Sequence, residues 1–305
     1  MPERTEIYHA FLSGWHDQFK EYGVKLVTVF DGSVPTVRHA GKSYARDEIM
    51  LRESANYSDL IFTANDGVRN LGFAFAHRYL RPDVYLTLDD DVLPHGDTIG
   101  DHLRTLNIMV SLSWMSTASE YMRGFPYNTR DEAHVMVSHG VWQNVHDYDA
   151  PTQLVLGNRP ATFPSMPIPR GIYAPICGMN LAFHSSVLAF CYFSPMGPSV
   201  NLDRFADIWM GIFLKREMDR LGCAIYTGGA SCWHTRASNI WANLKKESND
   251  GLRLNETLWQ GDETDPYFDI YANKRERWRK FLSLDEGTLS KSWQETSQEL
   301  AHVAV

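Results

Sequence analysis

VYLTLDDDVLP, residues 84–94, is the stretch that decides the fold. Its first five residues have the apolar and β-branched composition of a buried strand. Three carboxylates, Asp89–Asp91, follow that strand, and they repel one another unless a cation holds them together. Their hard oxygen atoms suit Mg²⁺ or Mn²⁺, which often share their coordination sphere with substrate phosphates. Taken alone, the triplet is equally compatible with an acidic loop between a strand and a turn.

Helical and extended patterns alternate on both sides of this strand. Helices are predicted over 5–22, 66–80 and 203–221, with a weaker one over 46–58, and further strands over 24–30, 60–63, 134–137 and 224–232. This alternation predicts an α/β fold with a mostly parallel central sheet flanked by helices. Ligands of such sheets bind at the carboxyl ends of strands, where Asp31 and the acidic triplet are placed.

Two further regions complete the predicted organisation. The segment 123–178 is rich in Pro, Gly, Asn and Asp, and loops this long are commonly functional. Residues 251–305, which include a charged helical segment over 273–281, are predicted to form a C-terminal helical extension of a domain spanning 1–250.

The bulk composition excludes several classes of function. The chain has 305 residues and a formal net charge of -8, without a basic tract, so nucleic acid is not an expected partner. The four cysteines form no CxxC pair and are predicted to be reduced thiols. The sequence shows neither a secretory signal nor a membrane span, which predicts a cytoplasmic protein. It contains no GxGxxG fingerprint, so no flavin or nicotinamide site is expected.

Four groups of segments together are more specific than the triplet alone. They are LDDD (88–91); RGFPYNTR (123–130); VSHGVWQNVHDYDAPTQL (137–154) with CGMNLAF (177–183); and WH (233–234) with ASN (237–239) and NLKKE (243–247). The combination resembles the reversibly glycosylated polypeptides of plants, which are UDP-arabinopyranose mutases, with this chain as a bacterial-type relative. The resemblance implies a GT-A-like fold and a flavin-independent, metal-dependent enzyme that interconverts pyranose and furanose forms of a nucleotide sugar.

The resemblance also implies a metal site. Asp89 and Asp91 would hold the divalent ion, with Asp90 close to the substrate, and His234 would complete the site. A neutral imidazole is a reasonable ligand for Mn²⁺. A single histidine beside a tryptophan is otherwise more often a hydrogen-bonded core residue.

Two arginines carry the most unusual implication. Arg123 matches the arginine that becomes glycosylated in the family, and Arg130 matches a second essential arginine. A guanidinium group has a pKa above about 12 and is a poor nucleophile. From chemistry alone, both arginines are better interpreted as bidentate clamps on diphosphate oxygens.

Further residues match positions near the substrate. Asp207 matches a candidate general base or oxocarbenium stabiliser, although the family usually has two adjacent acids there and this chain has only one. The other predicted substrate contacts are Asp31, Asp66, Arg69, Asn180, Lys245 and Lys246. On sequence grounds, Asp207 could equally be a solvated helix residue, Asp66 and Arg69 an exposed ion pair, and the two lysines a solvated pair.

Two departures and two rival functions stay open. The family begins with a strand before its first helix, and this chain begins at the edge of that helix; either the fold does without the strand or the start lies upstream. The segment between Asp31 and Asp66 diverges, so UDP- and GDP-sugars both remain candidate substrates. A transferase acting on an external acceptor, or a non-catalytic nucleotide-sugar-binding protein, are the alternatives, and a homo-oligomer is possible.

Overall fold

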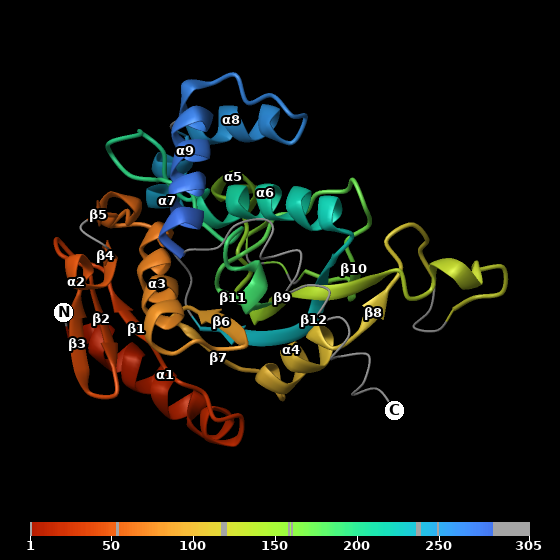
Figure 1. Cartoon of the computed structure of the whole chain (residues 1–305), viewed down its shortest axis with the longest axis horizontal. Coiled ribbons are helices and arrows are strands. Elements are labelled where there is room, and N and C mark those ends of the chain that lie inside the picture. Colours follow the sequence, from red (N-terminus) through yellow and green to blue (C-terminus); the bar gives the residue numbers. More distant parts are fainter. Residues whose placement is uncertain are drawn as a thin grey trace.

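A computed structural model of the chain describes residues 2–282, apart from 53–54, 117–120, 158, 160, 236–238 and 249. A central sheet lies between helices (Figure 1), with helix α6 (Ala206–Leu221) packed on one face and helix α4 (Thr98–Leu106) on the other. The predicted mixture of helices and strands is therefore confirmed.

Seven strands within the described residues form this sheet, in the order β10-β12-β9-β11-β6, with β7 beside β12 and β8 beside β9. Their bounds are β6 Val84–Leu88, β7 Val92–Pro94, β8 Met109–Val110, β9 Ala133–Asn144, β10 Met166–Pro167, β11 Asn180–His184 and β12 Ala224–His234. Side chains alternate between the faces, so that Leu181 and Phe183 face the α6 side while Ala182 packs on the α4 side.

The prediction of a mostly parallel sheet is wrong. Only β9 and β12 pair in parallel, and every other pairing in the described sheet is antiparallel. Even so, β6, β9 and β12 all run in one direction, which is the direction expected when strands alternate with helices along the chain. Strand β11 lies between β6 and β9, so two antiparallel pairings stand where β6 and β9 would otherwise pair in parallel. The residue pattern of a strand does not encode its neighbour, so this insertion was not predictable.

The strongest helix predictions are confirmed. The first helix, the helix around 66–80, the helix around 203–221 and the C-terminal helical segment are all present. The helices are α1 Pro2–Glu21, α2 Arg46–Met50, α3 Arg69–Tyr79, α4, α5 Ala150–Leu156, α6, α7 Ile240–Glu247, α8 Asp250–Leu258 and α9 Pro266–Leu282; short 3₁₀ turns are η1 Ser58–Leu60, η2 Asp66–Val68, η3 Tyr127–Thr129 and η4 Ser185–Val187.

The region before α3 departs most from prediction. The strand expected over 24–30 is only β1 (Thr28–Phe30), which pairs with β2 (Thr36–His39) and β3 (Lys42–Ala45) in a separate antiparallel sheet. The helix expected over 46–58 ends at Met50, before the short pair β4 (Leu51–Arg52) and β5 (Ala55–Asn56). The strand expected over 60–63 is absent from the described structure, where the Tyr192 hydroxyl donates to the Leu60 carbonyl at 2.7 Å.

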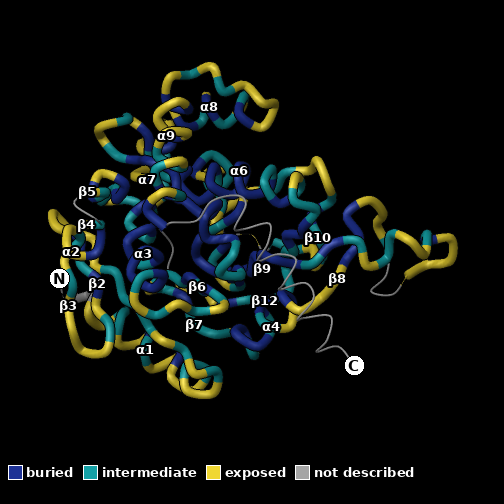
Figure 2. Tube along the Cα trace, in the orientation of Figure 1, coloured by how far each residue is buried: buried dark blue, intermediate teal, exposed yellow. Residues whose placement is uncertain are grey.

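The C-terminal helix α9 belongs to the main core. Trp278 and Phe281 are buried in the same apolar cluster as Trp209 of α6, and the Trp278 indole donates to the Leu188 carbonyl at 3.1 Å. Figure 2 shows the buried interior continuing from the sheet into this helix. The boundary at residue 250 stays a prediction, and residues 283–305 lie outside the described residues.

Two smaller predictions are also answered within the described chain. All four cysteines are free. None of the described helices combines the length and the apolar character that crossing a bilayer requires.

Candidate functional site

Three strands that run in the same direction end at one edge of the central sheet. Asp89 follows β6, Asp147 lies three residues beyond β9, and His234 ends β12, opposite Asn144 of β9 and Val92 of β7. Asp66 and Asp207, from η2 and α6, add two more carboxylates that interact electrostatically with this group. We call Asp66, Asp89, Asp91, Asp147 and Asp207, together with Arg69 and Arg204, the acid cluster.

Arg69 is the central cation of the acid cluster. It stands at the first residue of α3, pairs closely with the Asp89 carboxylate, and donates to the Thr87 hydroxyl at 2.9 Å. Burial opposes the charge of Arg69, but Asp89 and Asp66 more than offset that effect and raise its pKa. The ion pair expected for Arg69 therefore involves Asp89 directly, and it is partly buried rather than exposed.

Asp207 is the carboxyl with the most altered acidity. It is 9% exposed, and its Oδ2 accepts a hydrogen bond from the Gly178 amide at 2.9 Å. Burial raises the pKa of Asp207 to about 7, and the neighbouring Asp66 contributes further, against the Gly178 hydrogen bond. Burial likewise raises the pKa of Asp66, although Arg69 opposes it. Asp207 is thus a buried group suited to proton transfer near neutral pH, and its interpretation as a solvated helix residue is wrong.

A second ion-pair network, which the sequence did not reveal, borders the cluster. Arg204 donates to the buried Glu247 carboxylate at 2.8 Å and approaches Asp147 at 3.9 Å. Glu247 also accepts the Ala150 amide at 2.8 Å, which ties α7 to the start of α5. The Cys177 thiol donates to Asp147 at 3.5 Å, and burial followed by Asp147 raises its pKa well above the ordinary value. Cys177 is therefore a hydrogen-bond donor and not a thiolate nucleophile.

Asp91 and His234 provide the best place for a divalent cation. Asp91 Oδ1 is buried and has no hydrogen-bond partner among the described residues, while Oδ2 lies 3.7 Å from His234 Nε2. The other ring nitrogen, Nδ1, is 2.9 Å from the Val145 carbonyl, which leaves Nε2 facing Asp91. Burial would lower the pKa of His234, but the interaction with the neighbouring Asp91 carboxylate outweighs it and raises that pKa. An orphaned carboxylate oxygen beside an imidazole fits a Mn²⁺ or Mg²⁺ ion.

The protein ligands do not form a complete metal cage. Within the described residues, no three His, Cys, Asp or Glu side chains are arranged to hold a metal ion. Asp89, the third predicted ligand, is paired with Arg69. One or two protein ligands with phosphate and water oxygens are nevertheless the usual arrangement for Mg²⁺ at nucleotide sites.

The remaining predicted substrate contacts have different surroundings. Asp31 accepts the Ala64 amide at 3.0 Å, two residues before Asp66, although its strand belongs to the small sheet. Asp90 is exposed at the same turn as its neighbours. Asn180 is fully buried; its amide donates to the Val141 carbonyl at 3.1 Å, and its Oδ1 is 2.8 Å from His102 Nε2. These contacts favour a role for Asn180 in holding strands β9 and β11 together.

The two lysines lie on α7, close to the second ion-pair network. Lys246 pairs with Asp203 at 3.0 Å, one residue before Arg204, while Lys245 is exposed. The preceding motif residues 237 and 238 lie outside the described residues. The structure thus ties Lys246 of α7 to the loop that carries Arg204. It shows no contact of Lys245 with the acid cluster in the described residues.

The structure does not bring Arg123 and Arg130 to the acid cluster. Both lie before the start of β9, whereas Asp89 lies level with Val141 and His234 with Asn144. At about 3.3 Å per residue, the start of β9 at Ala133 is roughly 25–35 Å from the levels of Val141 and Asn144, where the acid cluster lies. Figure 1 shows their segment projecting from the side of the sheet, beyond β8.

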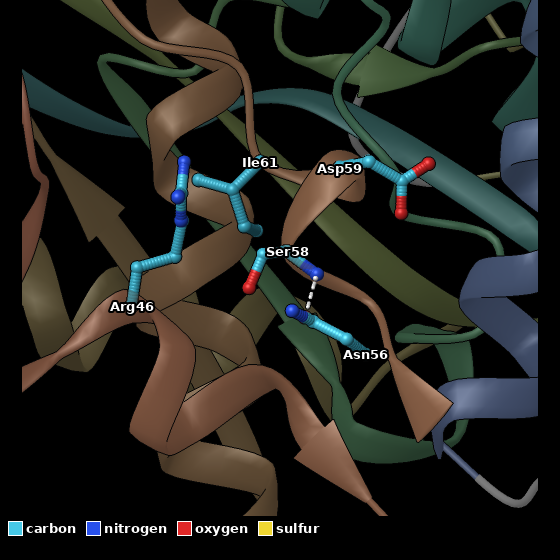
Figure 3. Close-up of a pocket in the computed structure, with 5 residues that line it drawn as sticks. All are labelled: Arg46, Asn56, Ser58, Asp59 and Ile61. Carbon is cyan, nitrogen blue, oxygen red and sulfur yellow. Dashed lines mark hydrogen bonds between the residues drawn. The ribbon is translucent and has the colours of Figure 1, made fainter. Parts of the chain in front are cut away.

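A pocket of about 420 Å³ lies elsewhere, lined by Arg46, Asn56, Ser58, Asp59 and Ile61 (Figure 3). None of these residues belongs to the acid cluster or to the predicted site. Asp59 is neutralised by Lys274 and Arg277 of α9, which lower its pKa to about 2 against the effect of burial. The pocket therefore offers no unpaired catalytic group.

Sequence reasoning missed Asp147, Cys177 and Arg204 as site residues. Asp147 and Cys177 stand inside the quoted motifs, so the motif itself was an available signal. Arg204 lies outside every motif and adopts a left-handed backbone conformation with φ of 69°, which no spacing rule predicts.

Comparison with known proteins gives a consistent result. The family described as reversibly glycosylated polypeptide matches residues 5–269. "Probable UDP-arabinopyranose mutase 4" of Arabidopsis thaliana is 31% identical over 94% of this chain and 79% of its own length. "UDP-arabinopyranose mutase 3" of the same plant is 32% identical over 85% of this chain and 74% of its own length. "UDP-arabinopyranose mutase 1" of Oryza sativa subsp. japonica is 31% identical over 78% of this chain and 70% of its own length.

Proposed function

The chain belongs to the reversibly glycosylated polypeptide family, and on that premise we propose that it interconverts the pyranose and furanose forms of a nucleotide-diphosphate sugar. The relatives' names make UDP-arabinopyranose the first substrate to test, with GDP-sugars second. The observation that carries the proposal is a buried carboxyl, Asp207, with a pKa of about 7 inside a charged cluster at the carboxyl ends of three strands.

Asp207 has the acidity that ring isomerisation needs. When the bond between C1 and the ring oxygen breaks, protonated Asp207 donates its proton to that oxygen. The resulting carboxylate then accepts the proton of the C4 hydroxyl as the C4 oxygen bonds to C1. One carboxyl therefore serves as acid and base without net proton transfer, so the single acid found at this position suffices.

Capture of the sugar requires a group that bonds C1 while the nucleoside diphosphate departs. In our proposal a guanidinium nitrogen of Arg123 forms that bond, its proton passes to a carboxylate, and the diphosphate leaves with the electron pair. After the ring has changed size, a diphosphate oxygen attacks C1 and the nitrogen recovers its proton. Arg130 is proposed to bind diphosphate oxygens.

A divalent metal held by Asp91 and His234, with Asp89 nearby, is part of the proposal. Bound there, it would neutralise charge on the diphosphate. Arg69 and Arg204 supply the protein's own positive charge at the cluster, since their partners Asp89 and Glu247 keep them in place. Asp31, Asp66 and Asp90 remain proposed contacts to the nucleotide or the sugar, and Lys245 and Lys246 remain proposed contacts to the diphosphate.

The test is an NMR-monitored reaction with UDP- and GDP-linked pyranoses and furanoses, with Mn²⁺ removed before acquisition. A ring-isomerised sugar still attached to its diphosphate supports the mutase and identifies the nucleotide. Asp207→Asn should slow the appearance of this signal at least about a hundredfold, whereas Asp269→Asn, at an exposed position of α9, should not. Release of free nucleoside diphosphate without an isomer would contradict the mutase proposal.

One observation favours a second candidate, a transferase that passes the sugar to an external acceptor. Arg123 and Arg130 lie far from the acid cluster of their own chain, and a transferase would need neither of them there. Such an enzyme would release nucleoside diphosphate in proportion to added acceptor, and its turnover would be unaffected by Arg123→Lys.

A further inference from the structure

The segment that carries Arg123 and Arg130 is organised by its own aromatic residues. We call its described residues, 114–116 and 121–131, the arginine arm. Phe125 is buried between Trp114 and Tyr121, with ring centroids 6.1 and 4.8 Å away, and the Tyr121 hydroxyl donates to the Arg130 carbonyl at 2.6 Å. The Arg130 guanidinium lies over the Tyr127 ring at 4.0 Å. The arm therefore has a defined shape while lying outside the three main cores.

The arm exposes an unusual amount of apolar surface. Tyr127 is 84% exposed, Met115 65% and Trp114 52%, and Met122 is also exposed. Ile108 and Met109, beside and within β8 at the base of the arm, are exposed as well. Several large apolar side chains exposed on one short segment are a feature of interaction surfaces.

The two arginines lack acidic partners in their own chain. Within the described residues, Arg123 forms neither a hydrogen bond nor an ion pair, and Arg130 contacts only a carbonyl and aromatic rings. The acid cluster has the opposite imbalance, with five aspartates against Arg69 and Arg204. Arm and cluster are therefore complementary in charge, yet they lie at opposite ends of β9.

The base of the arm is fixed to the sheet. The Glu132 amide donates to the Val110 carbonyl at 3.1 Å, and the Arg170 amide donates to the Leu112 carbonyl at 3.1 Å. The arm therefore leaves the sheet at a set position, and Figure 1 shows it extending away from the centre of its own chain.

We propose that the arginine arm docks on a second copy of this chain and places Arg123 and Arg130 at the acid cluster of that copy. A two-fold arrangement would form two such composite sites, each with the cluster of one subunit and the arm of the other. The exposed aromatic residues of the arm would supply the apolar contact, and the charge complementarity would set its position. The catalytic part of this inference rests on the proposed mutase function.

Mixing two inactive variants tests the composite site. Arg123→Ala keeps an intact cluster, and Asp207→Asn keeps an intact arm. After equilibration of equal amounts, half of the dimers contain both chains, and each of these has one fully intact site. Activity should return to about one quarter of the wild-type level. A mixture that stays inactive, while wild type is active, would overturn the proposal and leave the mutase function standing.

The matched control places both substitutions in one chain. When the double variant Arg123→Ala/Asp207→Asn is equilibrated with an equal amount of wild type, every mixed dimer has two defective sites. Activity per wild-type chain should fall to about half. An unchanged activity would mean that cluster and arm cooperate within one chain, and would contradict the proposal.

A cross-link tests the arrangement without requiring activity. Asp90 is exposed in the turn that carries Asp89 and Asp91 of the acid cluster. When an Arg123→Cys variant is equilibrated with an equal amount of an Asp90→Cys variant, a short bismaleimide linker should join the two introduced thiols across the interface and give a covalent dimer on a denaturing gel. Neither variant alone should give that dimer. Only monomer, or a wild-type protein that is monomeric by analytical ultracentrifugation, would overturn the proposal even if the mutase function had failed its own test.

Discussion

The acid cluster and the arginine arm differ in almost every physical respect. In the cluster, charged groups are close together and partly buried, and they change one another's acidity, as Asp207 and Arg69 illustrate. In the arm, Arg123 is exposed and has no ion-pair partner within the described residues, and the aromatic side chains around Arg130 face solvent.

The contrast distinguishes the charged side chains of the cluster, which contacts within one chain hold in position, from the side chains of the arm, which remain exposed for binding. A buried carboxylate costs folding free energy unless it is paired or protonated, so its retention indicates a function. An exposed arginine beside exposed aromatic residues costs little, and it can bind only what approaches from outside. Most charged groups of the cluster have partners in their own chain, whereas the two arginines of the arm have no acidic partner among the described residues.

The Arg123→Lys substitution should have the greatest effect on activity. Lysine retains the positive charge and loses the planar fork, so a proposed glycosyl acceptor or clamp would be lost, with isomerisation reduced at least about a thousandfold. Turnover by the NMR assay is the measurement. Near-normal turnover would exclude a chemical role for this arginine, and an unchanged circular dichroism spectrum would confirm that the variant is folded.

Asp207→Asn should lower kcat by about a hundredfold to ten-thousandfold, because the amide can neither donate nor accept the transferred proton. The KM should change much less. Asp269→Asn is the matched control, since that aspartate is exposed on α9. Equal kcat values for the two variants would refute the assignment of Asp207 as the acid and base.

The same substitution should alter the pH dependence of stability. Because the pKa of Asp207 is raised in the folded state, its stability contribution is complete below about pH 4 and is lost as the pH rises toward 7. Asp207→Asn should therefore become progressively more stable relative to wild type over that range, by up to about 4 kcal/mol. Urea unfolding at pH 5 and pH 8 measures this change. A difference between the two proteins that is independent of pH would contradict it.

Asp91→Asn should weaken Mn²⁺ binding in the presence of UDP by at least about tenfold, because it removes a proposed ligand whose buried oxygen lacks a partner in the described structure. Electron paramagnetic resonance of free Mn²⁺ gives the affinity. Asp90→Asn, at the exposed middle position of the triplet, should have a smaller effect. The reverse order would move the metal site away from Asp91.

Tyr127→Ser should change the free energy of unfolding by no more than about 0.5 kcal/mol, because this side chain is 84% exposed. Trp278→Ala, in the buried core, should cost about 3–5 kcal/mol and provides the comparison. Urea unfolding of both variants is the measurement. A large loss of stability in Tyr127→Ser would show that the arm supports the fold of its own chain.

Local sequence patterns correctly predicted the helices and strands that have one side or both sides buried in the core. The apolar stripe containing Trp209 and Phe213 identified α6, and the run from Val84 to Leu88 identified β6, because both patterns reflect which side of an element is buried. The strand expected at 60–63 failed, because a short apolar run can equally be buried without pairing to another strand.

The candidate site was predictable to the extent that a motif marked it. The acidic triplet, His234 and Asp207 were identified, and the structure places them close to the shared edge of the sheet. Arg204 was not identified, because its role depends on Glu247, which is 43 residues away in the chain. The sequence also grouped the arginine arm with the cluster, whereas register along β9 separates them.

Composition, periodicity and motif content were sufficient to establish the class of fold, the order of its main helices and strands, and the family of the protein. These properties depend on neighbouring residues, or on motifs that can be compared with those of other sequences. Only the folded chain determined three others: the insertion of β11, the burial that raises the pKa of Asp207, and the distance between arm and cluster. Each of them arises from contacts between residues far apart in sequence, and a local pattern carries no record of such contacts.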